Sequence, residues 1–257
     1  MNGKANNWTR DELKMAISLY CKIPFKSTRK ESPEIIRWAK IIGRSPGGLY
    51  AKLCNLGNCD KAMQDINVKG LSHTGKLDPI MWNEFVEDPE RIVYEGELLL
   101  AQHMGLPIEK YAEIDENELP SGEMREVVIR QRINQRFFRN AVLVAYENRC
   151  CISGISNSSL LDACHISSWK DDIKNRTNPK NGLCMNPLFH RAFDKYLICV
   201  TPDYTIEVSE QMLEITKEET FRRYLLQLHH TDIHLPNKFS PDKELLAIHY
   251  ERFRQNS

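Results

Sequence analysis

Two histidines and one aspartate have the residue types and spacing for joint chemistry in this sequence. His165 lies within LLDACHISSWKDD, and His190 follows in NPLFHRAFD, four residues before Asp194. A neutral imidazole can accept a proton near neutral pH, because its unperturbed pKa is about 6.5. His190 and Asp194 would share one face of a helix, where imidazole and carboxylate can hold a divalent cation. A base beside a cation is a suitable arrangement for activating a water molecule.

The residues around these side chains predict two strands and one helix. The apolar residues from Leu160 to Ile166 predict a buried strand over 160–166, and a second strand is expected over 182–186. Pro187 favours the start of a helix that would run to Lys195. His165 would then lie on the first strand and His190 on the helix, within one ββα unit.

Hydrolysis of a phosphodiester needs contributions that such a unit could supply. It requires an activated water, a Lewis acid at the phosphate and leaving oxygen, and compensation for the charge of the transition state. His165 could serve as the general base, a role that typically gives roughly 10²–10⁴-fold in rate. Three cations lie close enough in the sequence to hold a substrate backbone, namely Lys170, Lys180 and Arg191.

A longer pattern surrounds His165, Asn181 and His190, with CHISSW, NPKNGLCM and HRAFDKYLI around them. This pattern resembles the HNH endonucleases, in the branch of bacterial restriction-type enzymes. The resemblance runs from about Arg132 to the end, about half of the chain. It implies a ββα-metal nuclease in which His165 is the general base and His190 binds the metal. It also implies that Asn181 braces the site or orients the base.

The residue before His165 departs from the pattern of that family. Many HNH enzymes have an acidic or histidine ligand there, whereas this sequence has Cys164. Cys164 either packs within the strand, with Asp194 or Asp162 completing the metal site, or binds a softer ion as a thiolate. The first interpretation is favoured, because Mg²⁺ requires oxygen ligands. Mg²⁺ or Mn²⁺ is therefore the expected ion, and Zn²⁺ or Ni²⁺ the alternative.

The first 57 residues predict three short helices. Thr9 precedes the first, Ser32 and Pro33 begin the second, and Ser45 begins the third after a stop at Gly43. The last two resemble a helix-turn-helix, whose second helix could enter a major groove. Arg44 and Lys52 are then candidates for contacts to DNA, although such helical trios also serve as plain packing modules.

The formal net charge of zero hides an uneven distribution of charge. Residues 1–57 carry +7, residues 58–123 carry −10, residues 124–200 carry +6 and residues 201–257 carry −3. Two basic blocks suit a protein that touches polyanions with two surfaces, although charge blocks also merely solvate a face. A basic helix with one face available to phosphates is expected from Met124 onward, and the acidic block could associate with a basic surface of the same chain.

The composition gives no indication of a membrane or secreted protein. No apolar run approaches the roughly 20 residues of a membrane helix, and the first residues lack the apolar core of a signal peptide. The eight cysteines include no C-x-x-C pair, so we interpret them as mostly reduced thiols. These features predict a cytoplasmic protein.

We expect an α+β protein with a helical, helix-turn-helix-like module over 1–57, an acidic linker over 58–123 and an HNH domain over 124–257. The expected activity is metal-dependent cleavage of double-stranded DNA, with a homodimer as one route to double-strand cuts. A role in restriction of foreign DNA follows from the resemblance only. The alternatives are a non-catalytic DNA-binding regulator with a structural ββα unit, and a nuclease for RNA or single strands.

Overall fold

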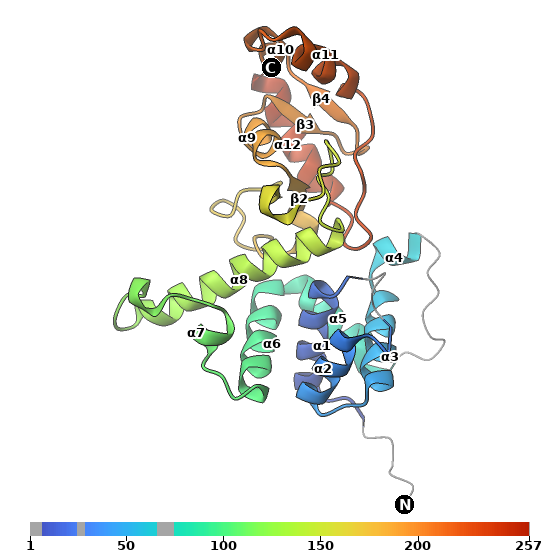
Figure 1. Ribbon diagram of the computed structural model, residues 1–257, viewed down its shortest axis with the longest axis vertical. Helices are drawn as coiled ribbons and strands as arrows, with labels where there is room; N and C mark the ends of the chain where they lie inside the picture. The colour runs from blue at the N-terminus through green and yellow to red at the C-terminus, as the bar shows by residue number, and fades with distance from the viewer. Residues whose placement is uncertain (1–6, 25–28, 66–74, 257) are drawn as a thin grey trace, which may run out of the picture. The chain divides into compact units, whose positions relative to one another are not determined.

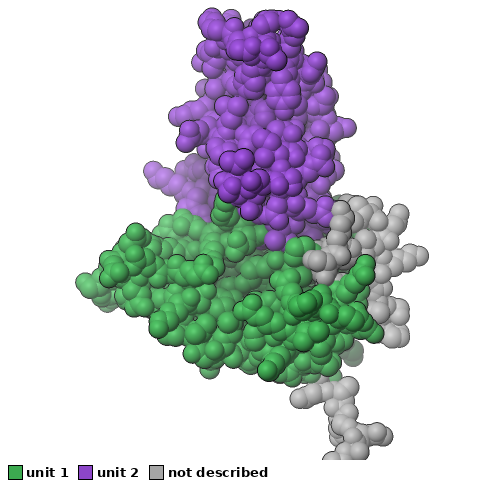
Figure 2. All heavy atoms as spheres, viewed as in Figure 1, with its two compact units in different colours: residues 1–140 green, residues 141–257 purple. Residues whose placement is uncertain are grey.

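The chain forms two compact units, residues 1–140 and residues 141–257. The structure is a computed structural model that describes residues 7–24, 29–65 and 75–256 (Figure 1). Figure 2 shows the first unit in green and the second in purple. Helix α8, Met124–Ala145, begins in the first unit and ends in the second.

The first unit is helical throughout its described residues. Helix α1 packs against α3, α5 and α6, and α2 packs against α3. Helices α1 and α6 pack closely at Gly96, where an added Cβ would lie 2.7 Å from the backbone oxygen of Lys14. The helices that precede α8 are α1 Arg10–Lys22, α2 Pro33–Ile42, α3 Pro46–Gly57, α4 Lys61–Asp65, α5 Leu77–Glu87, α6 Pro89–His103 and α7 Ile108–Tyr111.

The three helices expected in the first 57 residues are confirmed, together with their boundaries. Thr9 and Glu12 form a capping box at the start of α1, in which each side chain accepts from the other's backbone N–H. Gly43 ends α2 with a φ of 79°, a conformation that glycine adopts without strain. The hydroxyl of Ser45 accepts from the Gly48 N–H at the start of α3.

The linker expected over 58–123 differs from the structure, because this segment supplies helices to the core of the first unit. Trp82 and Phe85 of α5 and Leu100 of α6 are buried against α1 and its neighbours. Pro79 and Pro89 and the many acidic residues weaken the apolar pattern along the sequence, but each proline lies in the first turn of its helix. Several of the acidic side chains pair with basic residues of the same unit, among them Asp78 with Lys52 and Glu97 with Lys22.

Four of the five arginines of α8 pair with glutamates of this acidic segment. All four pairs lie within the first unit, with N···O distances of 3.0–3.4 Å, and they are Arg125–Glu109, Arg130–Glu90, Arg132–Glu118 and Arg136–Glu113. The face of α8 that we expected to meet phosphates is therefore occupied by glutamates along this stretch. The structure thus confirms that the acidic block associates with a basic surface of the same chain, namely the arginines of α8.

The two cations of this unit expected to contact DNA are engaged inside it. The Arg44 guanidinium donates to both carboxylate oxygens of Glu12, at 2.7 and 2.6 Å, and lies over the ring of Trp8. Lys52 is only 6% exposed and donates to the carboxylate of Asp78, which is itself fully buried. Lys52 is thus inaccessible to a phosphate, and the expected contact is corrected to a buried ion pair.

The second unit contains two small antiparallel sheets flanked by helices. Strand β1 pairs with β2, and β3 pairs with β4. Helix α9 contacts β1, β2 and β3, and α12 packs on β3. The elements are β1 Asp162–His165, β2 Gly182–Met185, α9 Pro187–Asp194, β3 Ile198–Val200, β4 Ile206–Val208, α10 Glu210–Ile215, α11 Glu219–Leu228 and α12 Lys243–Asn256. The α+β class and the ββα order are confirmed, with a first strand shorter than expected.

All eight cysteines are free thiols, as the sequence indicated, and six of them are buried. Among the described residues, no helix combines the length and apolar character required to cross a membrane.

The buried Lys52–Asp78 pair is expected to stabilise the first unit. Replacing Lys52 by methionine should lower the free energy of unfolding by about 3–5 kcal/mol, because the Asp78 carboxylate would stay buried without its cation. Urea unfolding followed by circular dichroism measures this loss. The control is Lys30→Met, whose ammonium lies on the surface 3.6 Å from Glu31 and should contribute less than about 1 kcal/mol. Equal losses for the two variants would contradict the structural role of Lys52.

Candidate active site

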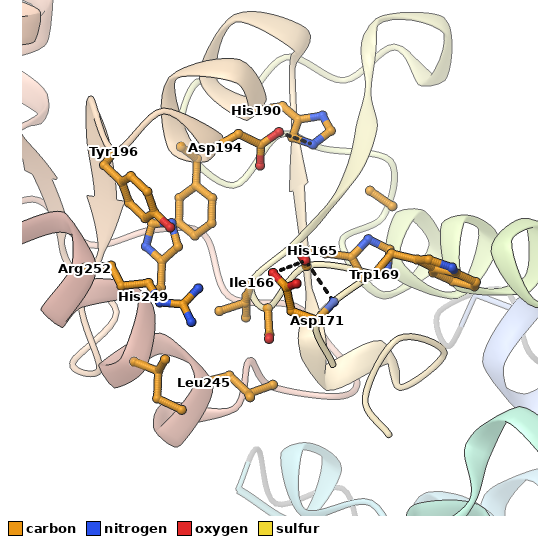
Figure 3. Close-up of a pocket in the computed structure, with 15 residues that line it drawn as sticks. His165, Ile166, Trp169, Asp171, His190, Asp194, Tyr196, Leu245, His249 and Arg252 are labelled. Atoms are coloured by element: carbon orange, nitrogen blue, oxygen red, sulfur yellow. Dashed lines mark hydrogen bonds and ion pairs between the residues drawn. The ribbon is translucent and has the colours of Figure 1, made fainter. Parts of the chain in front are cut away.

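A pocket of about 360 Å³ in the second unit brings the two expected histidines together (Figure 3). Strand β1 and the loop after it form one side, α9 forms another, and α12 closes the third. His165, His190 and Asp194 all line this pocket. The fold thereby brings His165 and His190, which lie 25 positions apart in the sequence, to the same pocket.

His165, at the end of β1, is held in one orientation by two contacts. Its Nε2 lies 2.9 Å from the backbone oxygen of Arg176, and the edge of its ring meets Trp169 at a centroid distance of 5.6 Å. A carbonyl oxygen can only accept, so Nε2 carries the proton and Nδ1 bears the lone pair of the neutral ring. Burial lowers the pKa of His165, an effect that the Arg176 carbonyl opposes and the nearby His190 reinforces. The imidazole is therefore neutral at neutral pH and suited to accept a proton.

Asn181 does not line the pocket but ties together the loop that supports His165. Its side chain is fully buried, and its Oδ1 accepts from the Ser167 N–H at 2.7 Å. Its Nδ2 donates to the carbonyl of Ser167 at 2.9 Å and to that of Asn175 at 3.2 Å. Asn175 directly precedes Arg176, whose backbone oxygen accepts the hydrogen bond from the His165 Nε2–H. Asn181 is thus linked to His165 through the backbone of this loop and does not contact it directly.

His190 lies between two carboxylates. Its Nδ1 is 3.2 Å from Oδ2 of Asp162 on β1, and its Nε2 is 3.5 Å from Oδ2 of Asp194 on the same helix. The start of α9 is fixed by Asn186, whose side chain accepts from the Phe189 N–H, and by Pro187 at the first helical position. An imidazole that donates one N–H to a carboxylate presents its other nitrogen to a metal, a common arrangement in metalloproteins.

Cys164, His190 and Asp194 form a group that could hold a metal ion, since their candidate ligand atoms lie within 4.8 Å of one another. The imidazole and carboxylate suit a divalent cation. Cys164 fits less well, because it is fully buried in the strand. Burial raises the pKa of its thiol well above the usual value, and the carboxylates of Asp194 and Asp162 raise it further. The burial and the raised pKa of its thiol favour the interpretation in which Cys164 packs in β1, which leaves His190 and Asp194 as the candidate ligands.

Helix α12 contributes a wall of the pocket that the sequence analysis did not identify. His249 stacks on Phe193 of α9 with the rings 3.7 Å apart and nearly parallel, and its Nδ1 lies 3.3 Å from Cys199 Sγ. Burial lowers the pKa of His249 to about 4, so it stays neutral. Arg252 is exposed three residues later, and Figure 3 shows its guanidinium directed into the pocket. The spacing of these two residues in HYERF places both on one helix face, which is the signal that could have revealed them.

The cations expected to hold a substrate near the motif lie outside this pocket. Lys170 and Arg191 are exposed, and Lys180 is half-buried with its backbone engaged by Asn178 and Asp242. None of the three lines the space beside His165. The cation that does so is Arg252.

Comparison with known proteins identifies the family of this part of the chain. Residues 150–201 match the sequence model of the HNH endonuclease family, and this range includes β1, β2, α9 and β3. No curated protein sequence matches the chain. The C-terminal half of the chain therefore contains a domain of the HNH endonuclease family.

Proposed function

We propose that the protein is a metal-dependent DNA endonuclease that hydrolyses phosphodiester bonds in the pocket of its HNH domain. One observation carries the proposal: the oriented, neutral imidazole of His165 shares a pocket with the His190–Asp194 pair. A base and a candidate metal site that face one space are what an activated-water mechanism requires.

His165 would take the proton of the attacking water on Nδ1. The hydrogen bond from Nε2 to the Arg176 carbonyl keeps that nitrogen protonated, and it strengthens when the ring becomes an imidazolium. Trp169 restricts rotation of the ring, so its lone pair keeps one direction. Asn181 would support this geometry through the loop and take no direct part in the reaction.

His190 and Asp194 would hold the divalent cation, and Asp162 would orient His190. Such a cation supplies Lewis acidity at the scissile phosphate and the leaving oxygen. The Asp194 carboxylate would suit Mg²⁺ or Mn²⁺, with water completing the coordination, and Zn²⁺ or Ni²⁺ are the alternatives in which Cys164 becomes a ligand. Arg252 would hold a non-bridging phosphate oxygen, since guanidinium matches phosphate geometry with paired donors.

The substrate we propose is double-stranded DNA, and the biological role is restriction of foreign DNA in the cytoplasm. The family supports a nuclease, and the free thiols suit a reducing compartment. One pocket per chain cuts one strand at a time, so double-strand breaks would require two copies. Arg44 could add a contact to DNA from the first unit only by exchanging its Glu12 partner.

The test of the proposed activity is cleavage of plasmid DNA by the purified protein with Mg²⁺, Mn²⁺, Ni²⁺ or Zn²⁺. His165→Ala should reduce the rate roughly 10²–10⁴-fold, because the general base is removed. His234→Ala is the control, since His234 is an exposed histidine of the same unit that does not line the pocket. Plasmids with plain and with modified cytosine should both be included.

Other outcomes would favour an alternative function or contradict the assigned base. Salt-dependent DNA binding without cleavage under any metal would favour a non-catalytic regulator. Cleavage confined to RNA or to single strands would favour the second alternative. Full activity in His165→Ala would exclude His165 as the base.

Asp162→Asn should weaken Mn²⁺ binding roughly 10–100-fold, because the carboxylate that orients His190 is lost while the shape of the side chain is kept. Isothermal titration calorimetry with MnCl₂ measures the affinity. Asp171→Asn is the control, since Asp171 lines the same pocket but accepts its hydrogen bond from Ser168 at 2.7 Å. An equal loss in both variants would show that only the overall negative charge matters.

Arg252→Gln should lower the cleavage rate about tenfold or more while leaving the thermal unfolding temperature unchanged, because an exposed phosphate contact is removed. Arg254→Gln is the control, since Arg254 is exposed on the same helix and does not line the pocket. Cleavage that is unchanged in Arg252→Gln would remove this residue from the site.

A further inference from the structure

The first unit contains a second pocket of about 360 Å³, separate from the HNH domain. The described residues that line it all belong to the first unit, from α1, α2, α6, the segment Met104–Glu113 and α8. Its volume is within the range of sites that hold small molecules. Nothing in the proposed nuclease chemistry uses it.

Charged and polar groups line part of this pocket. The Lys22 ammonium lies 2.5 Å from the carboxylate of Glu97, which is only 6% exposed, and 3.3 Å from the hydroxyl of Tyr111. Burial raises the pKa of Tyr111, and the charge of Glu97 raises it further, so the hydroxyl keeps its proton. An ammonium, a carboxylate and a phenol together offer donors and acceptors to the edge of a polar ring.

Aromatic and apolar side chains supply the rest of the lining. Trp38 and Tyr111 contribute rings, and Met104, Ile133 and Phe137 contribute further apolar surface. Aromatic walls bind planar heterocycles by stacking, at about 1–3 kcal/mol per base in nucleic-acid complexes. A simple inorganic anion would gain nothing from these residues.

Three cations, Arg37, Lys110 and Arg136, complete the pocket. Within the described part of the chain, Arg37 and Lys110 have no carboxylate at ion-pair distance. Arg136 pairs with Glu113 at 3.0 Å, but the Glu113 side chain is 79% exposed, so the pair is weak and replaceable. Its Nη1 is buried and makes no hydrogen bond to a described residue. The Arg37 guanidinium lies over the ring of Trp38, 5.3 Å from its centroid, so Lys110 and Arg136 are the cations that an anionic group of a ligand would engage.

We propose that this pocket binds a nucleotide, with the base against Trp38 and Tyr111 and the phosphate on Arg136 in place of Glu113. Lys110 adds positive charge beside the phosphate. The nucleotide is either a free mononucleotide or one whose base has left the stack of a DNA strand; both present the same ring and phosphate. The proposal concerns the first unit alone and is tested by binding, so its outcome is independent of the nuclease assay.

The experiment titrates the full-length protein with the four deoxynucleoside 5′-monophosphates by isothermal titration calorimetry. Glu113→Gln should tighten binding of the preferred nucleotide several-fold, because the competing carboxylate is removed from Arg136. Arg136→Gln should weaken it about tenfold or more. Glu118→Gln and Arg132→Gln are matched controls, since this pair also joins the acidic segment to α8 at 3.1 Å but does not line the pocket. Both controls should bind as the unaltered protein does.

A second arm separates the two sources of the nucleotide. Duplex DNA carrying one 2-aminopurine should brighten on binding when a base is taken out of the stack, and mononucleotide should compete with that signal. Binding of the mononucleotide without brightening of the duplex identifies a free ligand. No binding of any monophosphate up to about 5 mM, or equal losses in Arg136→Gln and Arg132→Gln, would overturn the proposal. Inorganic phosphate that binds as tightly as the nucleotide would overturn it as well, because the aromatic lining would then have no role.

Discussion

The hydrogen bond from His165 to the carbonyl of Arg176 is the contact on which the geometry of the site depends. It fixes both the tautomer and the direction of the imidazole, so the lone pair of Nδ1 has one orientation. A backbone carbonyl can do this only if its loop is itself held in place. Asn181 provides that constraint, because its amide bonds the loop at Ser167 and again at Asn175, beside Arg176. The asparagine of the motif thus acts through the backbone, which explains why it is fully buried.

A few contacts also fix the side of the pocket formed by α9, which carries His190 and Asp194. Asn186 caps α9 and sets where its first turn begins, and this places His190 beside Asp162 of β1. The opposite end of α9 is clamped by the stack of Phe193 on His249, which draws α12 against it. Because His249 is neutral and buried, it serves as an aromatic surface, and the charge of that wall comes from Arg252. The pocket therefore requires the C-terminal helix, which lies outside the segment that matches the family.

Features encoded by neighbouring residues could be predicted from the sequence, whereas contacts between residues far apart in the chain could not. The caps at Thr9 and Ser45 and the β1–β2–α9 order are encoded by neighbouring residues, and they are confirmed. Lys52 was expected to contact DNA because it lies on the second helix of the helix-turn-helix-like pair. Its actual partner, Asp78, lies 26 residues further along the chain, in a segment whose sequence pattern does not predict a core helix. Arg252 was missed because the spacing in HYERF shows that it shares a helix face with His249, but the sequence does not show that this face meets His165. A local sequence pattern can therefore identify a candidate site histidine, but it cannot distinguish a lysine or arginine that is buried in an ion pair from one that is accessible to a ligand.

Charge counted along the chain consequently overstates what the first unit can offer to DNA. Its basic and acidic blocks neutralise each other, as the pairs of Arg125, Arg132 and Arg136 with glutamates demonstrate. A phosphate that approaches these arginines must replace a carboxylate, so the gain is the difference between two similar interactions. That difference becomes favourable where the displaced carboxylate is exposed and the incoming group brings further contacts. The Arg136–Glu113 pair lines a pocket with aromatic walls, and neither of the other two pairs lines that pocket, so we expect selective recognition at Arg136.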